Sequence, residues 1–140
     1  MQLKYLHDQM LTDYQNFVDE VTSDASKNKK DFSDSIDIME EKGIVPSRLL
    51  TSGIGLSGEI GEFNEIIKKT LFQGKEIDDH TKQHLKKELG DVMWYVAQGC
   101  IALDTSITEI ININIEKLQD RYDGGSFDVT RSENRKEGDI

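Results

Sequence analysis

Two short stretches decide the expected fold: EIGEFNEII at Glu59–Ile67 and ELGDVMWYV at Glu88–Val96. Each places two acidic residues three positions apart around a glycine, and each continues an apolar pattern with steps of three and four residues. Because such steps return to the same face of an α-helix, both stretches are predicted to be helical, with their acids beside an apolar stripe. Aligned on these acids, they look like one helical unit used twice.

The length and composition favour a single all-α domain covering residues 1–140. A chain of 140 residues has room for one core, and its one proline gives too few turn signals for an all-β sandwich. No apolar run is long enough to cross a bilayer, no secretory leader is visible, and the single cysteine, Cys100, excludes an internal disulfide. We therefore expect a cytoplasmic protein with no membrane partner.

The charge balance argues against a nucleic-acid partner. The chain carries 27 acidic and 17 basic residues, a net charge of -10. Such a surface repels a phosphate backbone unless basic groups cluster locally or a divalent cation intervenes.

The first part of the chain is expected to contain one long helix and a loop. Apolar residues recur at helical steps over residues 3–21. Residues 23–34 are rich in Ser, Asp, Asn and Lys, which predicts a solvated loop. Residues 36–41 are expected to add a short helix before Gly43.

Three further helices are expected in the remainder, which makes four main helices in all. The second covers residues 46–74 and the third residues 79–103. The fourth opens at Ser106, and Glu109 three residues later gives a capping-box pattern. The Gly-, Ser- and charge-rich residues 123–140 are expected to form an irregular tail.

Four acids are candidate metal ligands, because both apolar stripes are expected to enter a common core with the acid pairs facing each other at its margin. A single Glu-x-x-Glu is usually solvated surface, but two pairs at the same offset favour a shared site. Unpaired carboxylates in a partly desolvated site disfavour one another's ionisation, so a cation should lie among them. Oxygen ligands select a hard ion, which predicts Mg²⁺, with Mn²⁺ able to substitute. The predicted ligands are Glu59, Glu62, Glu88 and Asp91.

The glycines inside both acid motifs support this interpretation. Gly61 and Gly90 each weaken a helix by about 1 kcal/mol relative to Ala. We expect that they permit the close approach of another backbone or of a ligand.

Polar and basic residues extend the acid rows. Tyr95 continues the row of Glu88 and Asp91, and Lys69 extends the row of Glu62. On the fourth helix, a similar row borders the apolar stripe and consists of Asn114, Lys117 and Arg121. Basic groups beside a metal suit a polyphosphate, and the alternative is that they form ion pairs between helices.

Three runs, GLSGEIGEFNEIIKK, KKELGDVMWYVA and NIEKLQDRY, resemble the MazG-type all-α nucleoside triphosphate pyrophosphohydrolases. The match spans about residues 49–122, and the tail is similar to that of short, phage-like single-domain members. The resemblance implies a four-helix MazG-like bundle completed by dimerisation, as a homodimer or a dimer-of-dimers tetramer. It also implies Mg²⁺-dependent hydrolysis of nucleoside triphosphates to monophosphate and pyrophosphate, in the host cytoplasm if the protein is phage-encoded.

The resemblance also assigns roles to residues. The four acids would hold metal, and Glu62 would accept a proton from a metal-activated water that attacks the α-phosphorus. The polar row Asn114, Lys117 and Arg121 would contact the triphosphate and sugar, with Tyr95 packed near the sugar. Lys69 is a further candidate substrate contact from its place in the row of Glu62 alone.

Base recognition is the least specified part of the resemblance. The phage-like character favours dGTP or dCTP as substrate. The residues implied as possible base contacts are Asp13, Asn16, Phe17 and Ser52.

Other interpretations were weighed from the same residues. A di-iron carboxylate bundle is excluded, because no glutamate has a histidine three positions later. The three histidines, His7, His80 and His84, are expected to be solvated, and Trp94 to lie in the core or at a dimer interface. A non-catalytic dimeric acidic helical module that binds a basic host protein remains the alternative function.

Overall fold

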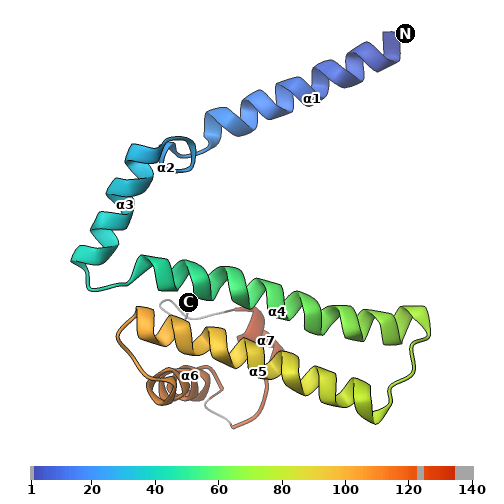
Figure 1. Ribbon diagram of the computed structural model, residues 1–140, viewed down its shortest axis with the longest axis vertical. Helices are drawn as coiled ribbons and strands as arrows, with labels where there is room; N and C mark the ends of the chain where they lie inside the picture. The colour runs from blue at the N-terminus through green and yellow to red at the C-terminus, as the bar shows by residue number, and fades with distance from the viewer. Residues whose placement is uncertain (1, 123–124, 135–140) are drawn as a thin grey trace. The chain divides into compact units, whose positions relative to one another are not determined.

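The computed structural model describes residues 2–122 and 125–134, with side chains from Gln9 onward, and this part of the chain is all helical. The all-α prediction is therefore confirmed. The helices are α1 (Gln2–Val21), α2 (Asp24–Lys27), α3 (Lys29–Glu41), α4 (Pro46–Gln73), α5 (Asp79–Ala102), α6 (Ile107–Arg121) and α7 (Val129–Glu133) (Figure 1).

The chain divides into two compact units, Met1–Lys42 and Gly43–Ile140. The first unit contains α1, α2 and α3, and the second contains α4 to α7. That both units form one domain stays a prediction.

In the first unit, the predicted loop over residues 23–34 is wrong, because α2 and the start of α3 occupy most of it. Local side-chain contacts explain the difference. Asn28 caps α3, its side-chain oxygen accepting from the Asp31 N–H at 2.9 Å, and Lys30 pairs with Asp34 one turn further on. The long first helix is confirmed, and the described apolar side chains of its stripe are exposed to solvent.

In the second unit, α4 and α5 form an antiparallel pair, and both agree with the predicted helices (Figure 1). The turn between them begins at Gly74, which has a left-handed φ of 70° and ends α4. At the opposite end of the pair, the Val45 N–H donates to the Ala102 carbonyl oxygen at 2.9 Å. These two connections fix which turns of α4 lie beside which turns of α5.

The predicted apolar stripes are only partly buried among the described residues. Ile60 and Leu89 belong to those stripes, yet they are 48% and 51% exposed. Most of the side chains that are buried on these two helices are small or polar, and Ile66 is the one large apolar side chain among them. The buried residues of α4 and α5 are Pro46, Ser52, Ile66, Thr81, Glu88, Cys100 and Ala102.

Helix α6 begins where predicted and contacts α5. Ser106 caps it, because its hydroxyl oxygen accepts from the Glu109 N–H at 3.1 Å. The other half of the capping box differs from expectation: the Glu109 carboxylate accepts from the Thr105 hydroxyl at 2.6 Å. A four-helix bundle completed by a second copy stays a prediction.

The segment predicted to be irregular contains the short helix α7, with Arg135 and the rest of the tail beyond it outside the described residues. Asp128 explains this helix, because its carboxylate accepts from the Arg131 N–H at 3.0 Å. Among the described helices, none combines the length and apolar character that crossing a membrane requires.

Candidate metal centre

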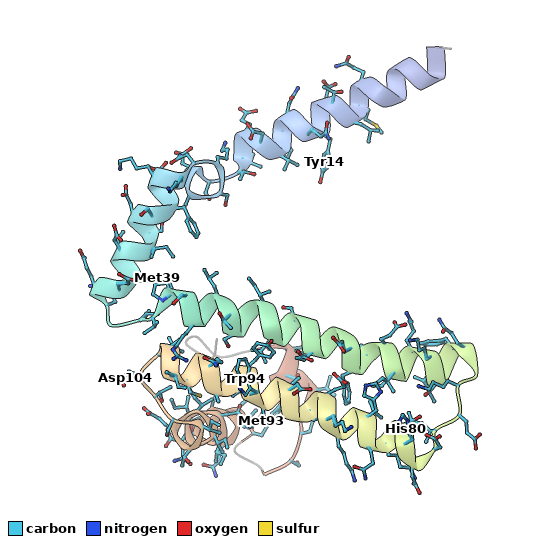
Figure 2. The ribbon with its side chains drawn as sticks, in the orientation of Figure 1. Tyr14, Met39, His80, Met93, Trp94 and Asp104 are labelled. Atoms are coloured by element: carbon cyan, nitrogen blue, oxygen red, sulfur yellow. The ribbon has the colours of Figure 1, made fainter. Side chains whose placement is uncertain are left out.

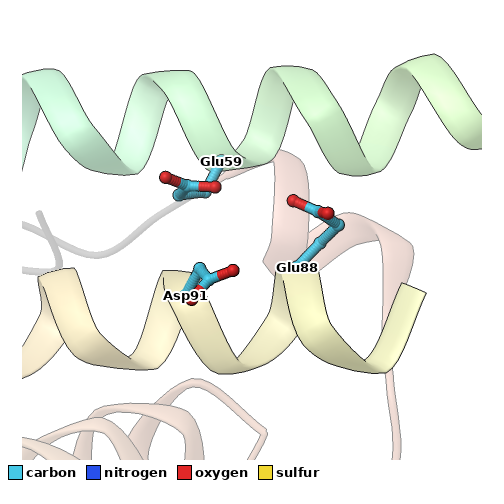
Figure 3. A group of neighbouring side chains, drawn as sticks. All are labelled: Glu59, Glu88 and Asp91. Carbon is cyan, nitrogen blue, oxygen red and sulfur yellow. The ribbon is translucent and has the colours of Figure 1, made fainter. Parts of the chain in front are cut away.

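Three carboxylates meet between α4 and α5. Glu59 extends from α4, and Glu88 and Asp91 extend from neighbouring turns of α5 (Figure 3). One oxygen from each lies within 4.8 Å of the other two. The three-residue spacing stacks the two α5 acids on one face of the helix, and the antiparallel pairing brings Glu59 opposite them. The structure thus joins three of the four predicted ligands.

Glu88 is the central member of this acid cluster. It is 5% exposed, which is rare for a glutamate without a compensating partner. Its Oε1 lies 2.9 Å from His84 Nε2. Its Oε2 is buried and has no hydrogen-bond partner among the described residues. A buried carboxylate oxygen left unpaired is costly, so this atom indicates a ligand that the described residues do not supply.

The pKa of Glu59 also indicates a cation at this site. Its pKa is raised above the ordinary value of 4.5, first by partial burial and then by the negative charges of Glu62, Asp91 and Glu88. The ionised form is therefore disfavoured at a place where several acids gather. A bound cation would reverse this effect, since it favours the ionised carboxylates.

Glu62 lies outside the acid cluster but close to it. It lines a hollow together with Lys69 and His84, and its charge contributes to the raised pKa of Glu59. Lys69 Nζ lies 3.3 Å from Glu65 Oε1, so the predicted substrate contact also forms an ion pair within α4. The roles of Glu62 as metal ligand and proton acceptor stay predictions.

Tyr95 is half-buried between α4 and α5. A Cβ added to Gly55 would lie 2.0 Å from Tyr95 Cε1, so the ring rests directly on the α4 backbone. The Ser52 hydroxyl donates to the Tyr95 carbonyl oxygen at 2.8 Å. Ser52, one of the predicted base contacts, therefore helps to hold the two helices together. The ring of Tyr95 is thus fixed one turn beyond Asp91.

Trp94 packs edge to face against Tyr95, with ring centroids 4.7 Å apart, and lies on α5 as Figure 2 shows. It is 53% exposed, so the prediction that it belongs to the core is wrong for this chain. Its place at a dimer interface stays a prediction.

The glycines of the acid motifs do not serve a helix contact within the described residues. A Cβ added to Gly61 or Gly90 would meet nothing within 4 Å, so no other backbone of the described residues approaches these glycines. The close contacts fall instead at Gly55, beneath Tyr95, and at Gly99, where Ser52 Oγ would lie 2.8 Å away. Approach of a ligand or a second chain to Gly61 and Gly90 stays a prediction.

The predicted polar row lies on α6, away from the residues that line the two hollows beside the acids. The second of these hollows is lined by α5 residues that include His80, Lys87 and Asp91. Contact between the α6 row and substrate stays a prediction. On α6, Asn114 and Lys117 are exposed and Arg121 is partly buried.

The predicted base contacts of α1 belong to the other compact unit, and their side chains are exposed. Their role stays a prediction. They are Asp13, Asn16 and Phe17.

His84 is the residue that sequence reasoning missed. It is predicted to be solvated, and its side chain is indeed 46% exposed, yet its Nε2 contacts the buried Glu88. The available signal was the four-residue spacing from His84 to Glu88, which places both on one helix face. His80 is exposed, and the side chain of His7 lies outside the described residues.

Comparison with known proteins identifies the family of this chain. The family model of the MazG nucleotide pyrophosphohydrolase domain matches residues 49–125. Over 74 residues the chain is 43% identical to the Gene 37 protein of Mycobacterium phage L5, and this covers 51% of the chain and 64% of the phage protein. The chain therefore spans less than two thirds of that relative, whose name states no activity. No solved structure gives a significant match.

The family match covers α5, α6 and all of α4 after its first three residues, and with them the whole acid cluster. It also extends over more than half of the chain. The chain belongs to the MazG nucleotide pyrophosphohydrolase family.

Proposed function

We propose that this protein hydrolyses nucleoside triphosphates to monophosphate and pyrophosphate, using Mg²⁺ held by Glu59, Glu88 and Asp91. The observation that carries the proposal is the buried, unpartnered Oε2 of Glu88 inside the acid cluster. Membership of the family supports the reaction type. We propose Glu62, in the adjoining hollow, as a fourth ligand and as the acceptor of a proton from the attacking water.

The donor set fits a hard divalent cation. The cluster offers carboxylate oxygens, which Mg²⁺ and Mn²⁺ prefer. The nearby imidazole of His84 contacts Glu88 through its Nε2 and is not a member of the cluster. When bound, such a cation would neutralise charge on the phosphates and lower the pKa of a water molecule.

The chain's own residues would bind and orient the nucleotide. Lys69 lines the same hollow as Glu62 and would offset charge on the leaving pyrophosphate. Tyr95, fixed on Gly55 beside the acids, would pack against the sugar. We propose that the α6 row supplies further triphosphate contacts from Asn114, Lys117 and Arg121.

A second copy of the chain is part of the proposal. Ile66, Cys100 and Ala102 are the buried hydrophobic residues of the described chain, whereas many large apolar side chains of α4, α5 and α6 are exposed. Ile54 and Phe72 are 73% and 81% exposed. Soluble monomers rarely leave large contiguous apolar patches uncovered, so we propose a homodimer or a dimer of dimers. Light scattering after size exclusion would give the mass in solution, and a monomer would contradict this part.

The alternative, a non-catalytic acidic module that binds a basic host protein, explains less. Such a module needs acids on its surface, where a partner can reach them. It gives no reason to bury Glu88 at 5% exposure with one oxygen unpaired.

The direct test offers each of the eight common ribo- and deoxyribonucleoside triphosphates with and without Mg²⁺, and identifies the products by chromatography. We expect monophosphate and pyrophosphate only with the metal, with dGTP and dCTP as the preferred substrates. Orthophosphate and diphosphate would contradict the proposal.

A pair of variants on α5 sharpens this test. Glu88→Gln should lower turnover by at least about 100-fold with helicity retained, because loss of an outer-shell partner alone costs up to about that much. Asp79→Asn is the matched control, since Asp79 lies on the same helix with its side chain 97% exposed. Equal activity in both variants would favour the binding module.

A further inference from the structure

His84 and Glu88 form a contact that the proposed function does not by itself require. They lie one turn apart on α5, and His84 Nε2 lies 2.9 Å from Glu88 Oε1. The two ends of this contact differ in exposure: the His84 side chain is 46% exposed and that of Glu88 is 7% exposed. The imidazole therefore reaches from the solvent side to a carboxylate enclosed between α4 and α5.

The two oxygens of Glu88 have different surroundings. Oε1 lies 2.9 Å from His84 Nε2, and Oε2 is buried without a hydrogen-bond partner among the described residues. A contact that restrains one oxygen of a carboxylate also restrains the direction of the other. Because ligating carboxylates are commonly oriented by hydrogen bonds from outside the metal's ligand set, this arrangement fits a positioned ligand.

His84 also lies where it can influence both sides of the site. It lines the hollow that contains Glu62 and Lys69, and it lines the second hollow with Lys87 and Asp91. Glu88 and Asp91 belong to the second hollow. The imidazole thus borders both of the hollows beside the acid cluster.

We propose that His84 is a positioning residue, which holds the Glu88 carboxylate so that only Oε2 is presented to the divalent cation. This inference rests on the proposed function, because it takes Glu88 as a metal ligand. A positioning role for His84 differs from a purely structural helix contact. A surface pair four residues apart contributes to helix stability and has no effect on metal affinity.

The test measures Mn²⁺ affinity of the full chain without nucleotide, by calorimetry and by the electron paramagnetic resonance signal of unbound Mn²⁺. His84→Ala should weaken Mn²⁺ binding about 10- to 100-fold, the usual effect of removing an outer-shell partner. His84→Gln keeps an N–H donor and should recover most of the affinity. Asn64→Ala is the matched control, because Asn64 is an exposed neutral residue of α4 that lines neither hollow.

The kinetic signature should agree with the binding data. In His84→Ala, the Mg²⁺ concentration for half-maximal turnover should rise by a similar factor, while kcat at saturating Mg²⁺ changes less. Equal Mn²⁺ affinity in the wild type and His84→Ala would overturn the positioning role, as would a His84→Gln variant as weak as His84→Ala. A wild type that releases no pyrophosphate from any nucleotide would instead overturn the proposed function, and circular dichroism confirms that each variant is folded.

Discussion

The ring of Tyr95 lies directly on the backbone of Gly55, so that a Cβ on this glycine would stand 2.0 Å from Tyr95 Cε1. This contact lies beside the acid cluster. Tyr95 shares α5 with Glu88 and Asp91, and Gly55 lies one turn before Glu59 on α4, so the separation of the three acids depends on it. The absence of a side chain at Gly55 therefore sets how closely the two acid-bearing helices approach.

Replacement of Gly55 by Ala should destabilise the protein. The added methyl overlaps the Tyr95 ring, and overpacking of this kind costs about 1–3 kcal/mol. Urea unfolding followed by circular dichroism would measure the loss. Gly53→Ala is the control, since a Cβ at Gly53 meets nothing within 4 Å in the described chain. That variant should be neutral or more stable by up to about 1 kcal/mol, and equal losses in both would refute the role of the Tyr95 contact.

Removal of the charge of Glu59 should stabilise the metal-free protein and abolish its activity. The pKa of Glu59 is raised, chiefly by partial burial and then by Glu62, so the ionised form is less favourable folded than unfolded. In EDTA at neutral pH, Glu59→Gln should therefore have a higher Tm than the wild type. Only the ionised carboxylate of Glu59 is disfavoured by folding, and this form is absent at low pH. The difference in Tm between Glu59→Gln and the wild type should therefore vanish as the pH falls below 4.5.

Glu65 lies on the same helix as Glu59, and its pKa is shifted in the opposite direction. Its pKa is lowered, first by a hydrogen bond from Lys68 and also by Lys69, so its ionised form is favoured in the folded state. Glu65→Gln should lower the Tm above pH 4.5, and the loss should fade as the pH falls through the depressed pKa. Added Mg²⁺ should raise the Tm of Glu65→Gln as it does that of the wild type, but not the Tm of Glu59→Gln. The same Mg²⁺ response in both variants would contradict Glu59 as a ligand.

Loss of the Ser106 cap should destabilise α6 without a direct effect on the acid cluster. The Ser106 hydroxyl accepts from the Glu109 N–H at 3.1 Å, and replacement of such a cap by Ala costs about 1 kcal/mol. Thermal unfolding would measure this. Ser57→Ala is the control, because Ser57 lies inside α4 and donates only to the Gly53 carbonyl oxygen at 3.0 Å. Ala is the better helix former at that site, so the control should be neutral or slightly more stable.

Local signals in the sequence predicted α4, α5 and α6 well. Pro46 begins α4, a left-handed Gly74 ends it, and Ser106 caps α6, and each of these acts within a few residues of chain. The same local reasoning failed over residues 23–34, where polar composition suggested a loop. There the polar residues are themselves the stabilising elements, because Asn28 caps α3 and Lys30 pairs with Asp34.

The sequence by itself determined the acid rows, because a spacing of three residues fixes which side chains share a helix face. Only the tertiary structure decided which of those acids meet. The antiparallel register of α4 against α5 joins Glu59 to Glu88 and Asp91, leaves Glu62 in the neighbouring hollow, and buries Glu88 beneath His84. Register depends on contacts between distant residues, such as Gly55 with Tyr95 and Val45 with Ala102, and periodicity along a single helix carries no information about them.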